Sequence, residues 1–122
     1  MTTSTTSATH HRWSEIPQEQ INASIARKFI SAERVTVGRF EMKAGAVVPK
    51  HAHENEQVSY VISGVLRFHF DDRDVLVGTG EVMQIPPNVS HGVDVLEDCI
   101  VVDVFCPVRQ DWIEKTDSYF RR

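Results

Sequence analysis

Histidine and glutamine side chains occur at spacings that could bring four metal ligands together. His51 and His53 are separated by one residue, and Gln57 and His91 follow along the chain. In an extended strand, residues i and i+2 point to the same face, so both imidazoles could reach one point in space. Three imidazoles and one amide oxygen would form a site for a divalent first-row metal, with positions left open to water or substrate. The alternative is that these are surface histidines at the edge of a loop.

A single aspartate lies within the apolar segment 100–109. Burial of an unpaired carboxylate is costly, so Asp103 should have a cation, a metal-bound water or hydrogen-bond donors as a partner. By strand parity, Val101, Asp103 and Phe105 share one face, and Arg109 follows at the exit of the strand. One interpretation is therefore that Asp103 and Arg109 form an ion pair that closes the end of a barrel.

Short β-strands are the elements that must position these residues. Apolar and β-branched runs alternate with Gly, Pro, Asn and Asp turn residues at intervals of about eight to twelve positions. The predicted strands span residues 24–30, 35–42, 57–62, 65–70, 75–77, 81–85, 93–96 and 100–105. Many short strands of this kind predict a sandwich or a small barrel. A short helix is predicted near the C-terminus, over residues 110–119.

The composition excludes several classes of protein. A chain of 122 residues fits one domain with a core, predicted as residues 13–122 after a disordered tail at 1–12. The net charge is −4 and the basic residues form no stripe, which argues against a nucleic-acid partner. No apolar stretch is long enough to cross a membrane, and residues 1–9 do not resemble a secretory signal. The two cysteines, Cys99 and Cys106, fit a reducing compartment, so we expect a cytoplasmic protein with both thiols buried.

Two longer motifs resemble those of the cupin family. The first consists of Gly45, His51, His53, Gln57 and Gly64, and the second of Gly80, Pro86, Pro87, Asn88 and His91. Two spaced motifs are a more specific signal than one histidine pair. The resemblance implies an all-β fold, the double-stranded β-helix or cupin jelly roll, in which two sheets enclose a cavity. It also implies that the inward-pointing metal ligands are His51, His53, Gln57 and His91.

The residues that follow the second motif narrow the resemblance. The order Asp103, Phe105 and Arg109 is similar to that in the cupins of pectin degradation, which linearise 4,5-unsaturated uronates. The resemblance implies that Asp103 is the acid/base, that Phe105 contacts the sugar ring and that Arg109 clamps the substrate carboxylate. It further implies a small anionic sugar acid as substrate and a homodimer as the assembly.

Gln57 stands where the first cupin motif usually carries Glu. A neutral amide leaves the bound ion its full positive charge, which favours Lewis-acid chemistry and the divalent state. Nitrogen and oxygen ligands suit Ni, Zn, Mn, Fe and Co alike. Two other functions remain open at this point: an iron-dependent cupin dioxygenase that uses the same ligands, and a non-catalytic cupin that binds a sugar or metabolite.

Overall fold

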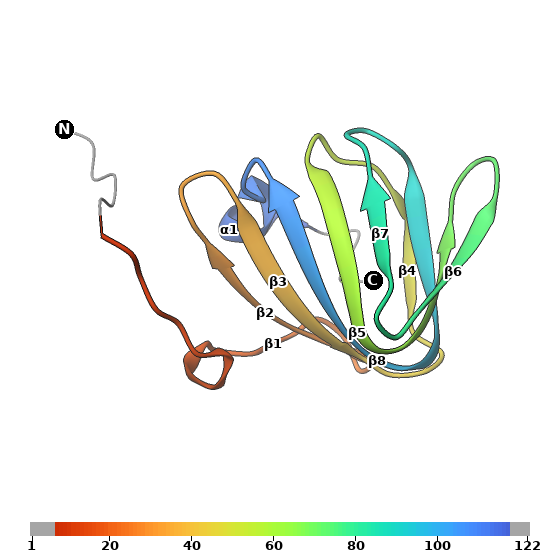
Figure 1. Cartoon of the computed structure of the whole chain (residues 1–122), viewed down its shortest axis with the longest axis horizontal. Coiled ribbons are helices and arrows are strands. Elements are labelled where there is room, and N and C mark those ends of the chain that lie inside the picture. Colours follow the sequence, from red (N-terminus) through yellow and green to blue (C-terminus); the bar gives the residue numbers. More distant parts are fainter. Residues whose placement is uncertain (1–6, 118–122) are drawn as a thin grey trace.

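Antiparallel strands make up nearly all of the regular structure (Figure 1). The computed structural model describes residues 7–117. Its strands are β1 (Glu19–Gln20), β2 (Ile25–Ser31), β3 (Thr36–Met42), β4 (Val47–His51), β5 (Glu56–His69), β6 (Asp74–Gly78), β7 (Val82–Ile85) and β8 (His91–Cys106). A 3-10 turn, Trp13–Glu15, precedes them, and the helix α1 (Gln110–Glu114) follows them. The predicted all-β fold with a short C-terminal helix is confirmed.

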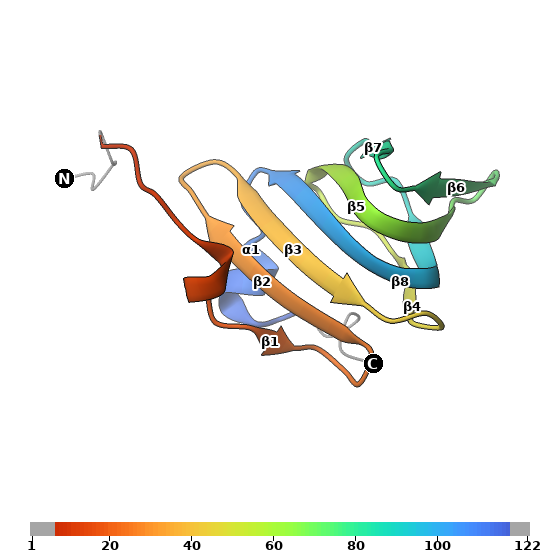
Figure 2. The ribbon, with the colours of Figure 1, turned by 60° about the horizontal axis from the view of Figure 1, so that its bottom comes forward.

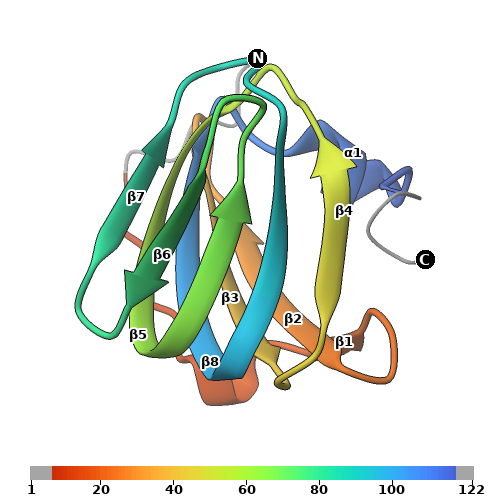
Figure 3. The same cartoon turned by 90° about the vertical axis from the view of Figure 1, so that its right-hand side faces the viewer.

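The two longest strands, β5 and β8, pair with each other and join the two layers of the molecule (Figure 3). The first part of β5 pairs with β7 and its last part pairs with β6. In the same way, the first part of β8 pairs with β4 and its last part pairs with β3. Each long strand therefore belongs to both layers, and the sheet folds over itself around an interior.

The prediction of separate strands at 57–62 and 65–70, and at 93–96 and 100–105, is wrong. Each pair is one continuous strand that bends at register shifts between Val61 and Leu66 of β5. Gly64 lies at this bend with a φ of +99°, and a Cβ there would come within 2.3 Å of the Asp98 carbonyl oxygen. Glycine is therefore required, because it reaches positive φ without strain and has no side chain to clash.

Alternating burial defines the inner and outer faces of the strands. Along the first half of β5, Gln57, Ser59 and Val61 are buried while the residues between them are exposed. The apolar core lies between the layers and includes Phe40, Val61, Leu66, Phe68, Ile85, Val101 and Phe105. Burial of these side chains is the main force that holds the layers together.

The helix α1 covers one end of the interior with Trp112, which is 1% exposed. The indole ring packs edge-on against Phe29, Phe40 and Phe105 at centroid distances of 5.4, 5.7 and 4.9 Å. The helix is shorter than the predicted 110–119, because Lys115 adopts the left-handed conformation with a φ of 60° and ends it. Residues 118 and 119 of the prediction lie outside the described residues.

Strand β4 is absent from the sequence prediction, although it carries His51 at its end. Pro49 lies within it, and proline cannot donate to a ladder, so the segment lacks a strand signal. Its one strand partner is β8, and proline is tolerated at such an edge. The predicted strand at 24–30, in contrast, is confirmed as β2.

The remaining predictions have mixed outcomes. Cys99 is buried as expected, but Cys106 is exposed, because it lies on the outer face of β8. Residues 7–12 are exposed and outside any helix or strand, while residues 1–6 lie outside the described part of the chain, so the disordered tail stays a prediction. Within residues 7–117, no helix has the length and apolar character needed to cross a membrane.

Candidate metal centre

Three histidines from distant parts of the chain converge inside one end of the fold. His51 ends β4, His53 lies in the connection to β5, and His91 begins β8. The register pairs His51 with His91 across β4 and β8, with ring centroids 4.4 Å apart. One nitrogen from each of the three rings lies within 4.8 Å of the others. His53 stands just after β4 rather than in it, so the loop, and not strand parity, places it beside His51.

Backbone carbonyl groups fix the orientation of all three rings. The Nδ1 atoms of His51, His53 and His91 lie 2.8, 3.0 and 2.8 Å from the carbonyl oxygens of Pro49, Asn55 and Val89. A carbonyl oxygen only accepts, so each Nδ1 carries the hydrogen and donates it. In the neutral ring, Nε2 then presents a lone pair, which is the arrangement of metal-ligating histidines.

Burial keeps these rings in the form that binds a metal. It lowers the pKa of His51 and His53 to about 4 each, and it lowers the pKa of His91 as well. The positive charge of Arg109 shifts all three pKa values in the same direction, while the backbone hydrogen bonds oppose the shift. The three imidazoles are therefore neutral at pH 7, and a metal ion does not have to displace protons from them.

Gln57 lies beside the histidines on the inner face of β5, where it is 6% exposed. Its Oε1 lies 3.1 Å from Nε2 of His53, and its Nε2 donates to Oγ of Ser59 at 2.9 Å. Two lone pairs therefore face each other between Gln57 and the neutral His53. A cation placed between them removes this repulsion, so the donor set fits a divalent first-row metal with nitrogen and oxygen ligands.

Asp103 lies on the inner face of β8 and is 8% exposed. Burial raises the pKa of its carboxyl group to about 6, against the opposing effects of a hydrogen bond from Ser59 and the charge of Arg109. Its Oδ1 is buried with no hydrogen-bond partner among the described residues. A carboxyl group with a pKa near 6 and an unused oxygen can accept and return a proton at neutral pH.

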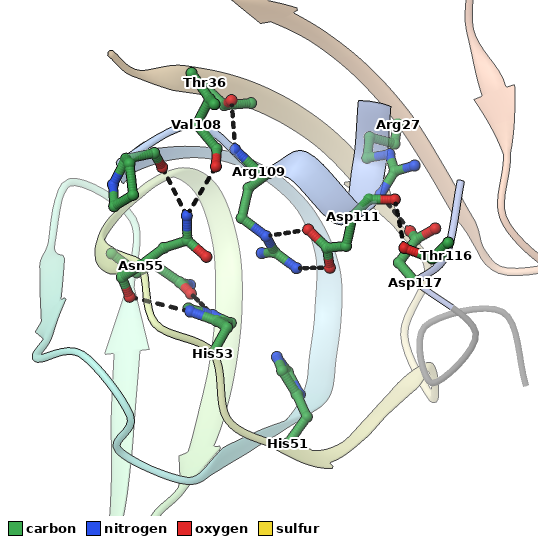
Figure 4. Close-up of polar contacts among 12 residues, drawn as sticks. Arg27, Thr36, His51, His53, Asn55, Val108, Arg109, Asp111, Thr116 and Asp117 are labelled. Carbon is green, nitrogen blue, oxygen red and sulfur yellow. Dashed lines mark hydrogen bonds and ion pairs between the residues drawn. The ribbon is translucent and has the colours of Figure 1, made fainter. Parts of the chain in front are cut away.

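Phe105 and Arg109 lie next to this carboxyl group. The ring of Phe105 packs against His53 at a centroid distance of 5.7 Å, and the guanidinium of Arg109 stacks 4.6 Å from the centre of the Phe105 ring. The Nε and Nη2 atoms of Arg109 donate to the two oxygens of Asp111 at 2.9 and 2.7 Å (Figure 4). The ion pair between Asp103 and Arg109 that the sequence left open is not formed in the described structure; Asp111 takes its place.

One pocket is lined by polar residues from the histidine group and from the group around Asp103. It is lined by His51, Gln57, Ser59, His91, Asp103 and Arg109, together with apolar side chains of the core such as Phe40 and Leu66. The structure thus brings together all of the sequence-predicted site residues, although His53 is not among the residues that line the pocket.

Asn55 is a structural residue of the site that the sequence analysis missed. Its side-chain amide donates to the backbone carbonyl oxygens of Pro107 and Val108 at 2.6 and 3.1 Å. The backbone carbonyl oxygen of Asn55 accepts from His53 (Figure 4). It therefore ties the histidine loop to the segment before Arg109. Asparagine in the acidic loop 54–56 carries no sequence signal for this role, because its partners lie about fifty positions away in sequence.

Arg27 is the second residue without a sequence signal. Its side chain is fully buried and pairs with Asp117 at 2.9 Å and with Glu19 at 3.2 Å. The guanidinium also lies 4.3 Å from the centre of the Trp112 ring. These contacts hold the C-terminal segment over the end of the pocket.

Comparison with known proteins agrees with this fold. The cupin domain family matches residues 38–105. The pectin degradation protein KdgF of Dickeya dadantii is 28% identical over 102 residues, which cover 81% of this chain and 93% of that protein. KdgF from a Halomonas species has a similar structure, with a TM-score of 0.75 and 26% identity over 81% of this chain and 94% of the other. An RmlC-like cupin from Shewanella frigidimarina superposes with a TM-score of 0.80 and 26% identity over 87% of this chain and 96% of the other.

A more distant likeness concerns the fold alone. Oxalate decarboxylase of Bacillus subtilis matches with a TM-score of 0.70 and 20% identity, over 78% of this chain and 28% of the larger enzyme. The matched family region contains the three histidines, Gln57 and Asp103, and it extends over more than half of the chain. The protein belongs to the cupin family.

Proposed function

We propose that this cupin is a metal-dependent enzyme that converts 4,5-unsaturated monouronates from the ring form to the open-chain keto form. The proposal is supported by the likeness to two KdgF proteins over most of their length. The single observation that carries it is the buried Oδ1 of Asp103, which has no hydrogen-bond partner among the described residues and lies in the pocket that His51 and His91 line. The proposed reaction is an isomerisation, and its substrate is an anionic sugar acid.

In this proposal His51, His53, Gln57 and His91 hold one divalent ion. Their neutral side chains leave its charge undiminished, so when bound it supplies Lewis-acid polarisation of substrate oxygens. The backbone carbonyls behind the histidines keep each Nε2 aimed at one place. Since N/O sites follow metal availability, Ni, Zn, Mn, Fe and Co all fit this set.

Asp103 moves the protons of the reaction. Ring opening removes the proton of the anomeric hydroxyl and breaks the bond between the anomeric carbon and the ring oxygen. A proton is then added to carbon 4 of the former double bond, so no atom is gained or lost. A carboxyl group whose pKa is raised to about 6 can take the first proton and deliver the second. Its apolar surroundings exclude water that would compete for these steps.

Arg109 and Phe105 bind the sugar in this proposal. Asp111 holds the guanidinium in a fixed orientation at the pocket, where its positive charge attracts the substrate carboxylate. Phe105 offers the apolar face on which a sugar ring can lie.

The test is a combined metal and activity measurement. Elemental analysis of the purified protein should find one divalent ion per chain, and the metal-loaded protein should remove the ultraviolet absorbance of a 4,5-unsaturated monouronate. Oxygen uptake that depends on substrate would instead indicate a dioxygenase. Tight binding of the uronate without any turnover would indicate a binding protein.

We further propose that the protein forms a homodimer through the outer face of β5, β7 and β8. Strands β5 and β8 lie side by side in Figure 2, and β7 pairs with the first part of β5. Val58, Tyr60 and Ile62 of β5 are 38, 44 and 41% exposed on the side where a solvent-facing sheet carries polar residues. Val82 of β7 and Val104 of β8 extend the same apolar surface. Such a surface marks an interface.

A second copy of this chain fits that surface. Arg39 and Glu41 of β3 lie beside it as an ion pair of 2.7 Å within the chain, so they add no net charge that would repel an identical face. Light scattering should give the mass of a dimer, and Tyr60→Glu should give a monomer. A wild-type monomer at micromolar concentration would contradict this proposal.

Two free cysteines among the described residues support the proposed cytoplasmic location.

A further inference from the structure

The side chain of Ser59 lies beside those of Gln57 and Asp103. Ser59 is fully buried on the inner face of β5, two residues after Gln57. Its Oγ accepts from Nε2 of Gln57 at 2.9 Å. Its hydroxyl also acts on Asp103, because it lowers the pKa of that carboxyl group. The register brings the two residues together, because Ser59 and Asp103 are cross-strand partners on β5 and β8.

The neighbouring strands offer no other hydrogen-bonding side chain beside Ser59 and Asp103 at these cross-strand positions. On the other side of Asp103 the cross-strand partner is Gly38, which has no side chain. On the other side of Ser59 the partner is Met83, which has no hydrogen to donate. The polar link between the amide and the carboxylate therefore depends on a single oxygen atom.

The chemistry of the hydroxyl group gives these contacts a direction. A serine hydroxyl has one hydrogen, and a carboxylate can only accept. When the hydrogen is donated to Asp103, Oγ faces Gln57 as an acceptor, so the amide must present its N–H to Ser59. The carbonyl oxygen of Gln57 then points to His53, as found at 3.1 Å. The reversed amide would turn two N–H donors toward the histidines, where a cation could not be bound.

We propose that Ser59 is a positioning residue that holds the amide of Gln57 with its oxygen toward the three histidines. The inference rests on the proposed metal site and deepens it. Hydrogen-bond partners behind a metal ligand typically change metal affinity by about 10- to 100-fold when they are removed.

The experiment measures the affinity of the metal-free protein for Co²⁺ by calorimetry, without any substrate. We expect Ser59→Ala to weaken Co²⁺ binding by about tenfold or more and Ser59→Thr, which keeps the hydroxyl, to retain it. Ser63→Ala, the same change further along β5, is the matched control and should bind as the wild type does. Thermal melting of the metal-free variants shows whether each one folds.

A second background separates orientation from packing. Gln57→Glu replaces the amide with a carboxylate, whose two oxygens are equivalent and need no orientation. The cost of Ser59→Ala in Co²⁺ affinity should therefore largely disappear in this background. An equal loss in both backgrounds would overturn the proposal, and so would a folded Ser59→Ala protein with wild-type affinity.

The outcomes also separate this inference from the proposed function. A wild type that binds no Co²⁺ overturns the metal site and the role of Ser59 together. Weakened binding in Ser59→Ala, rescued in Ser59→Thr, supports the inference even where no uronate is converted, in which case only the proposed reaction fails.

Discussion

The two polar walls of the pocket differ in how their side chains are held. The histidine wall consists of His51 and His91 with His53 beside them, and each ring donates to a carbonyl two residues away in sequence. In the carboxylate wall, formed by Asp103, Phe105 and Arg109, Asp111 holds the guanidinium locally, but the other supports come from remote strands. Ser59 of β5 is the cross-strand partner of Asp103, and Oγ1 of Thr36 accepts from the backbone N–H of Arg109 at 2.9 Å.

This difference predicts that the two walls have separate functions, one in metal binding and the other in catalysis and substrate binding. Local supports set the ring orientation of the histidines largely independently of how the barrel closes, which suits a site that must bind an ion before it can act. The carboxylate wall takes its geometry from the packing of β3, β5 and β8. Changes in the first wall should therefore remove the metal, and changes in the second should alter catalysis or substrate binding while the metal stays.

The largest effect is expected from His91→Ala. Removal of one of four ligands opens the site to solvent, so metal affinity should fall by more than about 100-fold, beyond the usual loss for a supporting residue. Activity should fall with metal content. Elemental analysis after dialysis checks this, with the exposed His10→Ala as the control. Full metal occupancy in His91→Ala would refute the four-ligand site.

Asp103→Asn should have the next largest effect, and on the turnover number alone. Asparagine keeps the shape but cannot accept or return a proton, so kcat should fall by about 10² or more while KM changes little. Metal content should stay at one ion per chain. Steady-state kinetics and elemental analysis on the same preparation test the split, and a loss of metal together with kcat would show that the walls are not independent.

Arg109→Lys is expected to act on KM. The lysine keeps the charge but loses the planar fork that Asp111 holds, so KM for the uronate should rise by about tenfold. An uncharged substrate analogue should be insensitive to the change. If kcat falls and KM does not, Arg109 has no role in binding the carboxylate.

The smallest effect concerns stability. The raised pKa of Asp103 means that the folded protein holds the proton more tightly, so this contribution to stability is fully present below the ordinary pKa of 3.8 and is lost as pH rises through about 6. Asp103→Asn should therefore make the metal-free protein more stable at pH 8 than the wild type, by up to about 3 kcal/mol. Urea unfolding at pH 4 and pH 8 measures it. A variant less stable than the wild type at pH 8 would show that Asp103 is a structural residue.

The same contrast explains which parts of the site are predictable from sequence. The candidate ligands lie in short motifs with fixed spacing, and the inner face of β8 follows from alternation. The grouping of His51, His53, Gln57, His91 and Asp103 could therefore be predicted without the structure. The continuity of β5 and β8 could not be predicted. A glycine such as Gly64 is expected both at a bend within one strand and in a turn between two strands, so its presence does not distinguish them. Asn55 and Arg27 could not be predicted either, since their partners are set by tertiary packing.

The pairing of Arg109 shows the same limit. Spacing places this residue at the exit of β8, but nothing in the sequence decides between Asp103 and Asp111 as its partner. The structure pairs it with Asp111, two residues later, because the start of α1 brings that carboxylate beside the guanidinium. Asp103 is left with an unused oxygen in the pocket, and this oxygen carries the proposed function.

The most direct test of the proposed reaction is proton NMR of a 4,5-unsaturated monouronate incubated in D₂O with the metal-loaded wild type. The proposed reaction predicts that the olefinic signal disappears and that the open-chain keto product carries one deuterium delivered to carbon 4. It also predicts that Asp103→Asn, with its metal bound, forms this product at least about 10²-fold more slowly. An olefinic signal that persists with the wild type, or that disappears equally fast with Asp103→Asn, would contradict it.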